Sequence, residues 1–313
     1  MPLDFSSYRI QELRVDRYGL EPLLAEISDL LPGNAFERQS GLQQLEELMR
    51  RSQGLVLKQG ERILALLIYL IRGNCCRLSF AYALRDAQPQ LMLQYLFQGL
   101  LNLAQEDPNI DSLRFDLVPW FPLSVELALQ TLEFTCVERM LLRREEPCPS
   151  TVPPFPDGIR LIPWDTWLTT PAAQILLIAF GGGFEGSWDR SLQEQSGCKQ
   201  FISDCYSGRF GTFDARVSFA LQQDNLLIGM SMAAWSKEGE GFIPAFGLLP
   251  QFTGQGLGNL MMAHLLKRYG ESTFPPRAVE LAVSEENRAA VHLYQKYGFR
   301  EKSRFRVYHY EIS

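Results

Sequence analysis

The chain has 313 residues, of which 46% are hydrophobic and 21% are charged, so it has ample material for packed cores and is not a disordered or low-complexity sequence. Its formal net charge is −6, from 30 basic and 36 acidic residues, which argues against nucleic acid as a partner because polyanion binding needs a basic field. At roughly 150 residues per domain, the length predicts two domains.

The start of the chain has no basic patch followed by an apolar stretch, so no secretory signal is expected. The longest apolar run, Ile63–Ile71, is far shorter than the roughly 20 residues that span a bilayer, and it predicts a buried strand instead. The six cysteines form no CxxC pair and only three histidines are present, so reduced thiols and no metal are expected. We therefore expect a cytoplasmic protein with no membrane span.

The rest of the first half predicts a strand at 77–84, an amphipathic helix at 89–104 and further strands at 112–118 and 136–142. Residues 147–156 then contain five prolines, which fit neither a helix nor a central strand and are typical of an extended linker. This predicts one domain at 1–146, a linker at 147–157 and a second domain at 158–313.

The second half repeats this order, with a strand at 242–249, a helix at 256–269 and strands at 278–283 and 303–310. Corresponding segments of the halves are 164 or 165 residues apart, which indicates a duplicated domain. A strand–helix–strand crossover places one parallel pair in a sheet that is otherwise antiparallel. The predicted fold class is therefore mixed α/β (α+β), with two tandem domains, each a mostly antiparallel sheet flanked by helices.

A glycine-rich turn, Thr253–Gly258, follows the strand at 242–249 and opens the next helix. Glycines let the backbone approach a ligand closely, and the unpaired N–H groups at a helix start attract an anion. The Gly-Lys-Ser/Thr of a Walker A loop is absent, and the late position and lack of a following acid exclude a Rossmann fingerprint. The turn predicts a pyrophosphate site built from backbone amides.

A second motif follows the strand at 278–284: Asn287, Tyr294, Gly298 and Phe299 fit the pattern Asn-x6-Tyr-x3-Gly-Phe. Together with the glycine turn, this arrangement closely resembles the GCN5-related N-acetyltransferase (GNAT) superfamily over residues 158–313. The family's motif A corresponds to Thr253–Gly258, where Thr253 replaces the usual Arg or Gln.

The first half lacks these features. The glycine turn corresponds to residues 83–91, which contain no glycine, and Tyr294 and Asn287 correspond to Leu129 and Pro122. The resemblance therefore implies a tandem arrangement in which the copy at 1–146 is degenerate and non-catalytic and the copy at 158–313 is catalytic.

The resemblance implies that acetyl-CoA or another acyl-CoA lies between the strands at 242–249 and 278–283. Tyr294 would act as the general acid for the leaving thiolate, although a packed helix tyrosine would look the same in sequence, and Asn287 could simply cap its helix. The residues expected to hold the cofactor are Leu248, Leu249, Thr253, Gly254, Gln255, Gly256, Leu257, Gly258, Asn259, Asn287 and Tyr294.

The general base stays unassigned, because the strand at 242–249 carries no carboxylate. The candidates are Glu238, Glu240 and Glu280, each of which could equally be a solvated turn or strand residue. A glycine-rich loop at 180–188 is expected to cover the acceptor with Phe184, Glu185 and Trp188.

The predicted function is acyl-CoA-dependent N-acyl transfer, with acetyl-CoA as donor and a primary amine of a small molecule or peptide as acceptor. One alternative is a non-catalytic acyl-CoA-binding sensor or interaction module, and another is transfer of a longer acyl chain to a peptide amine. The sequence leaves the acceptor, the acyl length and the oligomeric state open.

Overall fold

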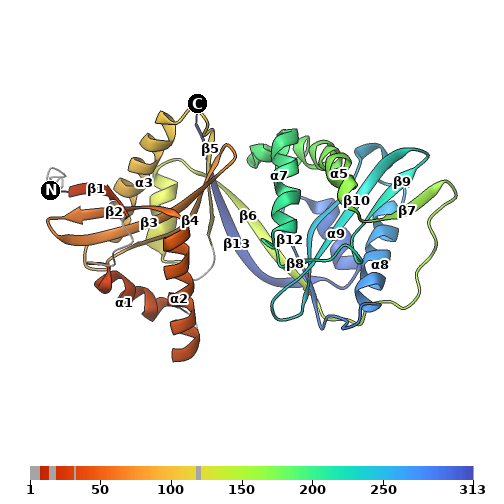
Figure 1. Ribbon diagram of the computed structural model, residues 1–313, viewed down its shortest axis with the longest axis horizontal. Coiled ribbons are helices and arrows are strands. Elements are labelled where there is room, and N and C mark those ends of the chain that lie inside the picture. Colours follow the sequence, from red (N-terminus) through yellow and green to blue (C-terminus); the bar gives the residue numbers. More distant parts are fainter. Residues whose placement is uncertain (1–7, 14–18, 32, 118–120, 313) are drawn as a thin grey trace. The chain divides into compact units, whose positions relative to one another are not determined.

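The computed structural model describes residues 8–13, 19–31, 33–117 and 121–312 (Figure 1). The contacts divide the chain into two compact units. Unit 1 comprises Met1–Val137 and Phe305–Ser313, and unit 2 comprises Glu138–Arg304. Each unit therefore includes a strand segment from the other half of the sequence.

Unit 1 is built on a sheet in which all neighbouring strands are antiparallel except the parallel pair β4–β5. Its strands, in spatial order, are β1 (Tyr8–Glu12), β2 (Gln53–Gln59), β3 (Arg62–Arg72), β4 (Cys75–Ala83), β5 (Ser112–Leu117) and the end of β13 (Arg300–Glu311). Its helices are α1 (Glu21–Leu30), α2 (Ala35–Arg51), α3 (Pro89–Glu106) and α4 (Leu123–Thr131).

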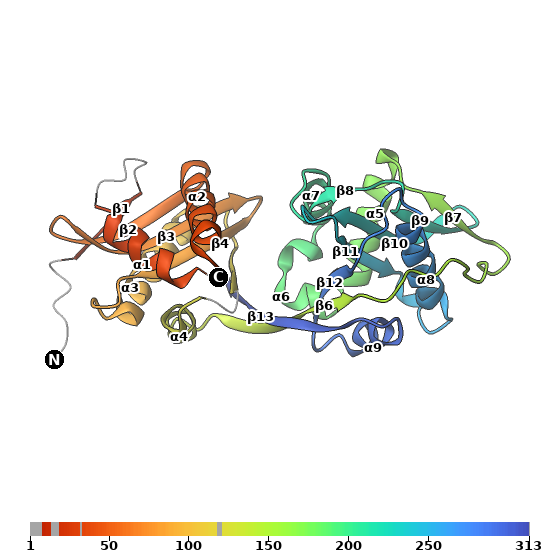
Figure 2. The ribbon, with the colours of Figure 1, turned by 90° about the horizontal axis from the view of Figure 1, so that it is seen from below.

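The core of unit 1 centres on β3, where all residues from Ile63 to Ile68 are buried. A strand buried on both faces needs cover on both, and helices supply it: α1 contacts β3 and β4, while α3 packs against β2, β3 and β4. Helices α3 and α4 lie side by side (Figure 2).

Unit 2 has the same plan. Its strands, in spatial order, are β6 (Thr135–Arg144), β12 (Val279–Ser284), β11 (Gly241–Leu248), β10 (Leu226–Trp235), β9 (Phe219–Gln223) and β7 (Ile159–Pro163), with β8 (Thr212–Phe213) also paired to β10. Its helices are α5 (Thr169–Leu176), α6 (Phe184–Trp188), α7 (Gln195–Tyr206), α8 (Leu257–Gly270) and α9 (Arg288–Lys296), with short helical turns η2 (Thr166–Leu168), η3 (Leu177–Gly181), η4 (Arg190–Gln193) and η5 (Pro250–Phe252).

Two apolar clusters cover the two faces of this sheet. One cluster joins α8 and α9 to one face through residues such as Met261, Leu265 and Tyr294. The other joins α5 and α7 to the opposite face through residues such as Ala173 and Ile202. A ligand bound between strands of this sheet would therefore lie between two groups of side chains, one from the α8–α9 face and one from the α5–α7 face.

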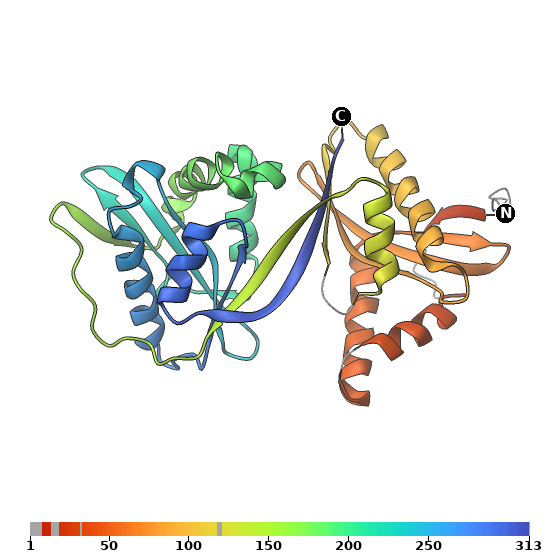
Figure 3. The ribbon, with the colours of Figure 1, turned by 180° about the vertical axis from the view of Figure 1, so that it is seen from behind.

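The last strand of each half pairs outside its own half. β13 follows α9 in the chain, and residues 306–311 of β13 pair with β5 in unit 1 (Figure 3). Residues 139–144 of β6, from the first half, pair with β12 in unit 2. Each unit is completed by a strand contributed by the other sequence half.

The duplication extends to fine geometry. The pairing register shifts on β4 between its partners Ile68 and Tyr69, and on β11 between its partners Met232 and Ala234. These β-bulges add one residue to the equivalent strand of each unit. The predicted fold class, two mixed α/β units with largely antiparallel sheets, is confirmed. No helix in the described ranges is long and apolar enough to cross a bilayer.

Candidate active site

The two parallel strands of unit 2 diverge after a short pairing, and the region between their separated ends is called the cleft below. β11 and β12 pair only at Gly241↔Val279 and Phe242↔Glu280, and beyond these positions they separate. Pro244 follows at the bulge, where its missing N–H leaves no donor unpaired. The splay leaves the edge of β11 that faces β12 without a strand partner along most of its length.

The backbone of Leu248 faces this open edge. The N–H of Leu249 donates a hydrogen bond to the carbonyl of Ile228 in β10 at 2.8 Å, and Leu248 lies opposite Gly229. In an antiparallel pair the hydrogen-bonding groups alternate in direction, so the N–H and C=O of Leu248 point away from β10. An extended ligand in the cleft could pair with them as an added strand does.

The glycine turn lies at the N-terminus of the 14-residue helix α8. Gly254 and Gly256 have φ angles of +74° and +81°, a region that L-residues with a Cβ rarely adopt. A Cβ at either position would meet no atom within 4 Å, so the space in front of the turn is open. The first N–H groups of the helix have no intrahelical acceptor and, with the helix dipole, suit an anion.

The neighbouring side chains of the turn are engaged locally. The Thr253 hydroxyl donates to the Pro250 carbonyl at 2.7 Å, and the Gln255 amide donates to the Gln251 carbonyl at 2.9 Å. A ligand at this turn would therefore contact backbone amides and not these side chains. Binding of this kind does not need the Arg or Gln that the family usually has at the position of Thr253.

Tyr294 is buried on α9, on the same face of the sheet as the helix α8. Its ring packs edge-on against Phe246 and Phe299, with centroid distances of 6.4 and 5.9 Å. Burial raises the pKa of the phenol well above its ordinary value, the charge of Glu185 raises it further, and Arg139 opposes this shift. The phenol is thus neutral at physiological pH, and no described residue hydrogen-bonds to its hydroxyl, so the proton is available for transfer.

Two asparagines of the predicted cofactor site have structural partners. The side-chain oxygen of Asn287 accepts a hydrogen bond from the N–H of Ala290 at 3.3 Å, so it caps α9 as the alternative interpretation expected. The backbone carbonyl oxygen of Asn259 accepts a hydrogen bond from the Tyr297 hydroxyl at 2.7 Å, which links the first turn of α8 to the end of α9.

The three carboxylates considered as bases lie at the closed end of the cleft or before it. Arg143 of β6 contacts both Glu240 and Glu280, each with a closest approach of 2.6 Å, and Lys302 contacts Glu280 at 2.7 Å. Hydrogen bonds from Arg143 lower the pKa of Glu240. Glu238 is exposed on the preceding turn, where a hydrogen bond with Ser236 lowers its pKa. The lowered pKa values make the carboxylates of Glu238 and Glu240 weak proton acceptors.

The segment at 180–188 is helical where the sequence predicts a glycine-rich loop. It comprises the π-helical turn η3 followed by α6, and Glu185 and Trp188 are buried while Phe184 is half-buried. A Cβ on Gly186 would lie 2.2 Å from the carbonyl oxygen of Gly181. These two glycines therefore allow the backbone to pack closely, and the side chain of Glu185 is held inside unit 2.

Three residues at the cleft escaped the sequence analysis: Arg139, Ser284 and Phe180. Arg139 on β6 lies opposite Ser284 in the strand register, and its guanidinium lies over the Trp188 ring at 5.2 Å. Phe180 packs so closely on Gly247 that a Cβ there would come within 2.8 Å of its ring. The available clue to Arg139 was that it shares one face of its strand with Arg143, with Leu141 between them.

Comparison with known proteins identifies the family of this unit. Residues 186–299 match the model of the acetyltransferase (GNAT) family. The C-terminal half of the chain carries a GNAT domain. No curated protein sequence matches the chain.

Solved structures show the tandem fold over the whole chain. A GCN5-related N-acetyltransferase from Sphaerobacter thermophilus is similar with a TM-score of 0.64 and 17% identity, covering 98% of this chain and 96% of that one. A tandem GNAT protein from the clavulanic acid biosynthesis pathway has a TM-score of 0.59 and 13% identity, covering 98% and 99% of the two chains. At such identities the likeness concerns the fold, which is a tandem GNAT fold.

Unit 1 presents the same elements, with a longer pairing of its two parallel strands before they separate. Its parallel strands β4 and β5 pair at four positions, Cys75↔Ser112 to Leu78↔Phe115, where the GNAT domain pairs at two. Gln88 before α3 has a φ of +53°, so it keeps the left-handed conformation of Gly256 but with a side chain. This turn therefore has a left-handed residue before its helix, as the glycine turn does, although it contains no glycine.

Acidic groups surround this turn of unit 1. The Arg62 guanidinium holds both carboxylate oxygens of Asp86 at 2.7 and 2.9 Å, and the N–H of Arg85 donates to the Glu26 carboxylate at 3.1 Å. A phosphate approaching the N–H of Arg85 would compete with the Glu26 carboxylate, which disfavours anion binding there.

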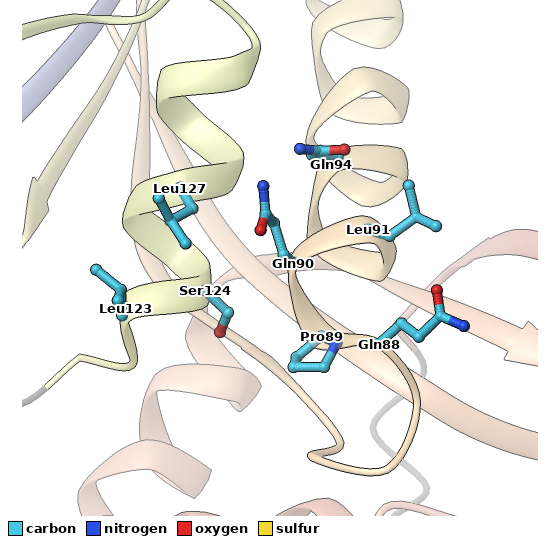
Figure 4. Close-up of a pocket in the computed structure, with 8 residues that line it drawn as sticks. All are labelled: Gln88, Pro89, Gln90, Leu91, Gln94, Leu123, Ser124 and Leu127. Carbon is cyan, nitrogen blue, oxygen red and sulfur yellow. The ribbon is translucent and has the colours of Figure 1, made fainter.

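The space between α3 and α4 is a groove of about 530 Å³ (Figure 4). On α4, buried Leu129 takes the place that Tyr294 has on α9. The residues that line the groove carry no charge: Gln88, Pro89, Gln90, Leu91, Gln94, Leu123, Ser124 and Leu127. Neither a phosphate contact nor a phenol is present among them.

Among the described residues, no group of three or more His, Cys, Asp or Glu side chains could hold a metal ion. Cys76, Cys148, Cys198 and Cys205 are free thiols.

Proposed function

We propose that the GNAT domain is an N-acyltransferase that uses acetyl-CoA and transfers the acetyl group to a primary amine of a small molecule or peptide. The observation that carries this proposal is the convergence of three features at one cleft: the splayed pair β11–β12, the open glycine turn before α8 and the buried neutral phenol of Tyr294.

The residues of the cleft suit an acyl-CoA. The amides of Gly254, Gly256 and Gly258 would bind the pyrophosphate, because the turn presents no side chain to block its approach. The backbone of Leu248 would pair with the pantetheine amides. The thioester supplies an activated acyl group, and the Tyr294 hydroxyl would give its proton to the departing sulfur.

The aromatic rings at the cleft favour a short acyl group. Phe180 closes on β11 at Gly247, and the half-buried Phe246 lies against Tyr294. We expect these two rings to limit the room for a long acyl chain beyond the thioester. This supports acetyl-CoA as the donor over longer acyl-CoA molecules.

We further propose that the copy at 1–146 is non-catalytic. Support comes from the acids around its turn, from Gln88 in place of a glycine and from Leu129 in place of the phenol. Its contribution to catalysis would be structural, through the strand β6 that it supplies to unit 2.

The test is release of free CoA thiol from acetyl-CoA with a panel of primary amines, for the wild-type protein and for Tyr294→Phe. We expect wild-type turnover and a fall of about 100- to 10,000-fold in kcat for Tyr294→Phe, with CoA affinity retained. Tyr206→Phe, a tyrosine change on α7, is the matched control and should keep full activity. Tight CoA binding without turnover of any amine would instead establish the acyl-CoA sensor, and a preference for longer acyl-CoA molecules would refute the assignment of acetyl-CoA.

A further inference from the structure

A buried carboxylate lies at the open end of β12. Ser284, the last residue of β12, donates a hydrogen bond from its Oγ to Oε1 of Glu185 at 2.8 Å. An Nη2 nitrogen of Arg139 lies 3.8 Å from Oε2 of the same carboxylate. Glu185 thus has a fixed position, set by the helix α6, the strand β12 and the strand β6.

The environment of Glu185 differs from that of Glu280, the carboxylate on β12. Its side chain is only 10% exposed and Ser284 is fully buried, whereas Glu280 lies four residues earlier on β12, about 13 Å along the strand, and is bound by two cations. No described residue donates a hydrogen bond to Oε2 of Glu185, and at 3.8 Å the Arg139 nitrogen is too far to do so. One oxygen of this carboxylate is therefore free to accept a proton.

The alternation along the strands places this carboxylate on the face of the sheet opposite Tyr294. Leu281 and Val283 of β12 belong to the cluster that packs under α8 and α9, so Ser284 and its partner Glu185 lie on the opposite face. Tyr294 belongs to the α8–α9 face. Since the strands separate between them, the two groups flank the cleft from opposite sides, and the charge of Glu185 acts on the Tyr294 phenol.

We propose that Glu185 is the general base of the GNAT domain, and that it selects an amine that arrives as an ammonium ion. This rests on the proposed function. The carboxylate of Glu185 takes one proton from the ammonium, which leaves a neutral amine with a free electron pair. That pair forms the N–C bond to the thioester carbonyl, the C–S bond breaks, and its electrons remain on sulfur.

The protons balance without a further reagent. The Tyr294 phenol gives its proton to the sulfur and regains one from the nitrogen, which keeps a single hydrogen in the amide product. Glu185 releases the first proton to water. The products are the N-acyl amine, CoA thiol and one proton.

Arg139 is the positioning residue for this base. It contacts the Glu185 carboxylate, donates a hydrogen bond to the carbonyl of Ala282 at 3.3 Å and stacks on Trp188. It therefore holds the Glu185 carboxylate in place from the side of β6. Because Arg139 lies on β6, the first half of the chain supplies a residue that acts on the chemistry of the second.

The test compares wild type, Glu185→Gln and Glu185→Asp in the CoA-release assay across pH, with an alkyl amine as acceptor. We expect kcat/KM for the amine to fall about 100-fold or more in Glu185→Gln at pH 7, and to recover as the pH approaches the amine's own pKa, because the amine then needs no base. Glu185→Asp should retain intermediate activity. The acetyl-CoA Kd, measured by calorimetry, should match wild type and shows that the variants are folded.

Glu271→Gln, an exposed carboxylate change at the end of α8, is the control and should leave the profile unchanged. Wild-type activity in Glu185→Gln, or a loss that persists equally at every pH, would overturn this inference alone. Absence of turnover in wild type would overturn it together with the proposed function. Should Glu185→Gln fail to fold, Ser284→Ala, which removes only the hydrogen bond to the carboxylate, must change the pH profile of kcat/KM; an unchanged profile would overturn the proposal.

Discussion

Replacing Gly256 by alanine tests whether the turn before α8 binds a pyrophosphate. Gly256 has a φ of +81° and a Cβ would meet nothing within 4 Å, so the folded protein loses only the cost of a left-handed L-residue, about 1–2 kcal/mol. Gly239, in the turn between β10 and β11, has a φ of +79° and is equally open. Gly239→Ala is therefore matched in conformation and in space, but lies outside the glycine turn.

The two variants should separate stability from binding. A methyl group at 256 would occupy the space through which a phosphate oxygen reaches the amides. Loss of one hydrogen bond to a charged group costs about 1.5–3 kcal/mol, which corresponds to a CoA Kd raised about 10- to 150-fold. Gly239→Ala should leave the Kd unchanged.

The assays are calorimetric titration with CoA and denaturant unfolding without ligand. Both variants should lower the free energy of unfolding by similar amounts, and only Gly256→Ala should weaken CoA binding. Wild-type CoA affinity in Gly256→Ala would refute the assignment of the turn, and equal weakening in both variants would show that the effect arises from stability.

Two further predictions concern stability. Burial raises the pKa values of Tyr269 and Tyr294 above the ordinary value of about 10, so these tyrosines ionise first in the unfolded chain as pH rises. Their contribution to the free energy of unfolding should be constant below about pH 10 and should fall above it. Denaturant titrations at several pH values would show this fall. A fall that begins near neutral pH would contradict this origin. Gly186→Ala should destabilise the protein by about 1–3 kcal/mol, because its Cβ would collide with the Gly181 carbonyl. The control Gly183→Ala should not destabilise it, because that Cβ would lie 3.4 Å from its nearest neighbour. Equal denaturant midpoints of unfolding for the two variants would argue against the close packing of η3 and α6.

The sequence was sufficient to predict the order and class of the elements. The strand at 242–249, the helix at 256–269 and the strand at 278–283 agree with β11, α8 and β12 to within one residue. These elements are fixed by local periodicity, by glycine conformation and by turn residues, all of which lie within short windows of the sequence. The roles assigned to Tyr294 and to the glycine turn stay predictions until the variants are measured.

The pairing of the last strands could not be predicted from the same information. Because the halves are copies, the apolar pattern of β6 fits the edge of β12 and that of β13 fits the edge of β5, and a pattern within one strand does not specify its partner. The contacts of Glu185 could not be predicted either, because its partners are distant in the sequence. Its partners Ser284 and Arg139 lie 99 and 46 residues away in the sequence, one on each side of the proline-rich segment.

The exchange of β6 and β13 has a consequence for how such a chain can change over generations. A deletion that removed the first half at the proline-rich segment would also remove β6, and with it Arg139 and the strand that covers the edge of β12. The remaining GNAT domain would expose an unpaired sheet edge, while β13 would lose the partner strand β5. The first copy, proposed to be non-catalytic, is thereby needed for the fold of its sister copy.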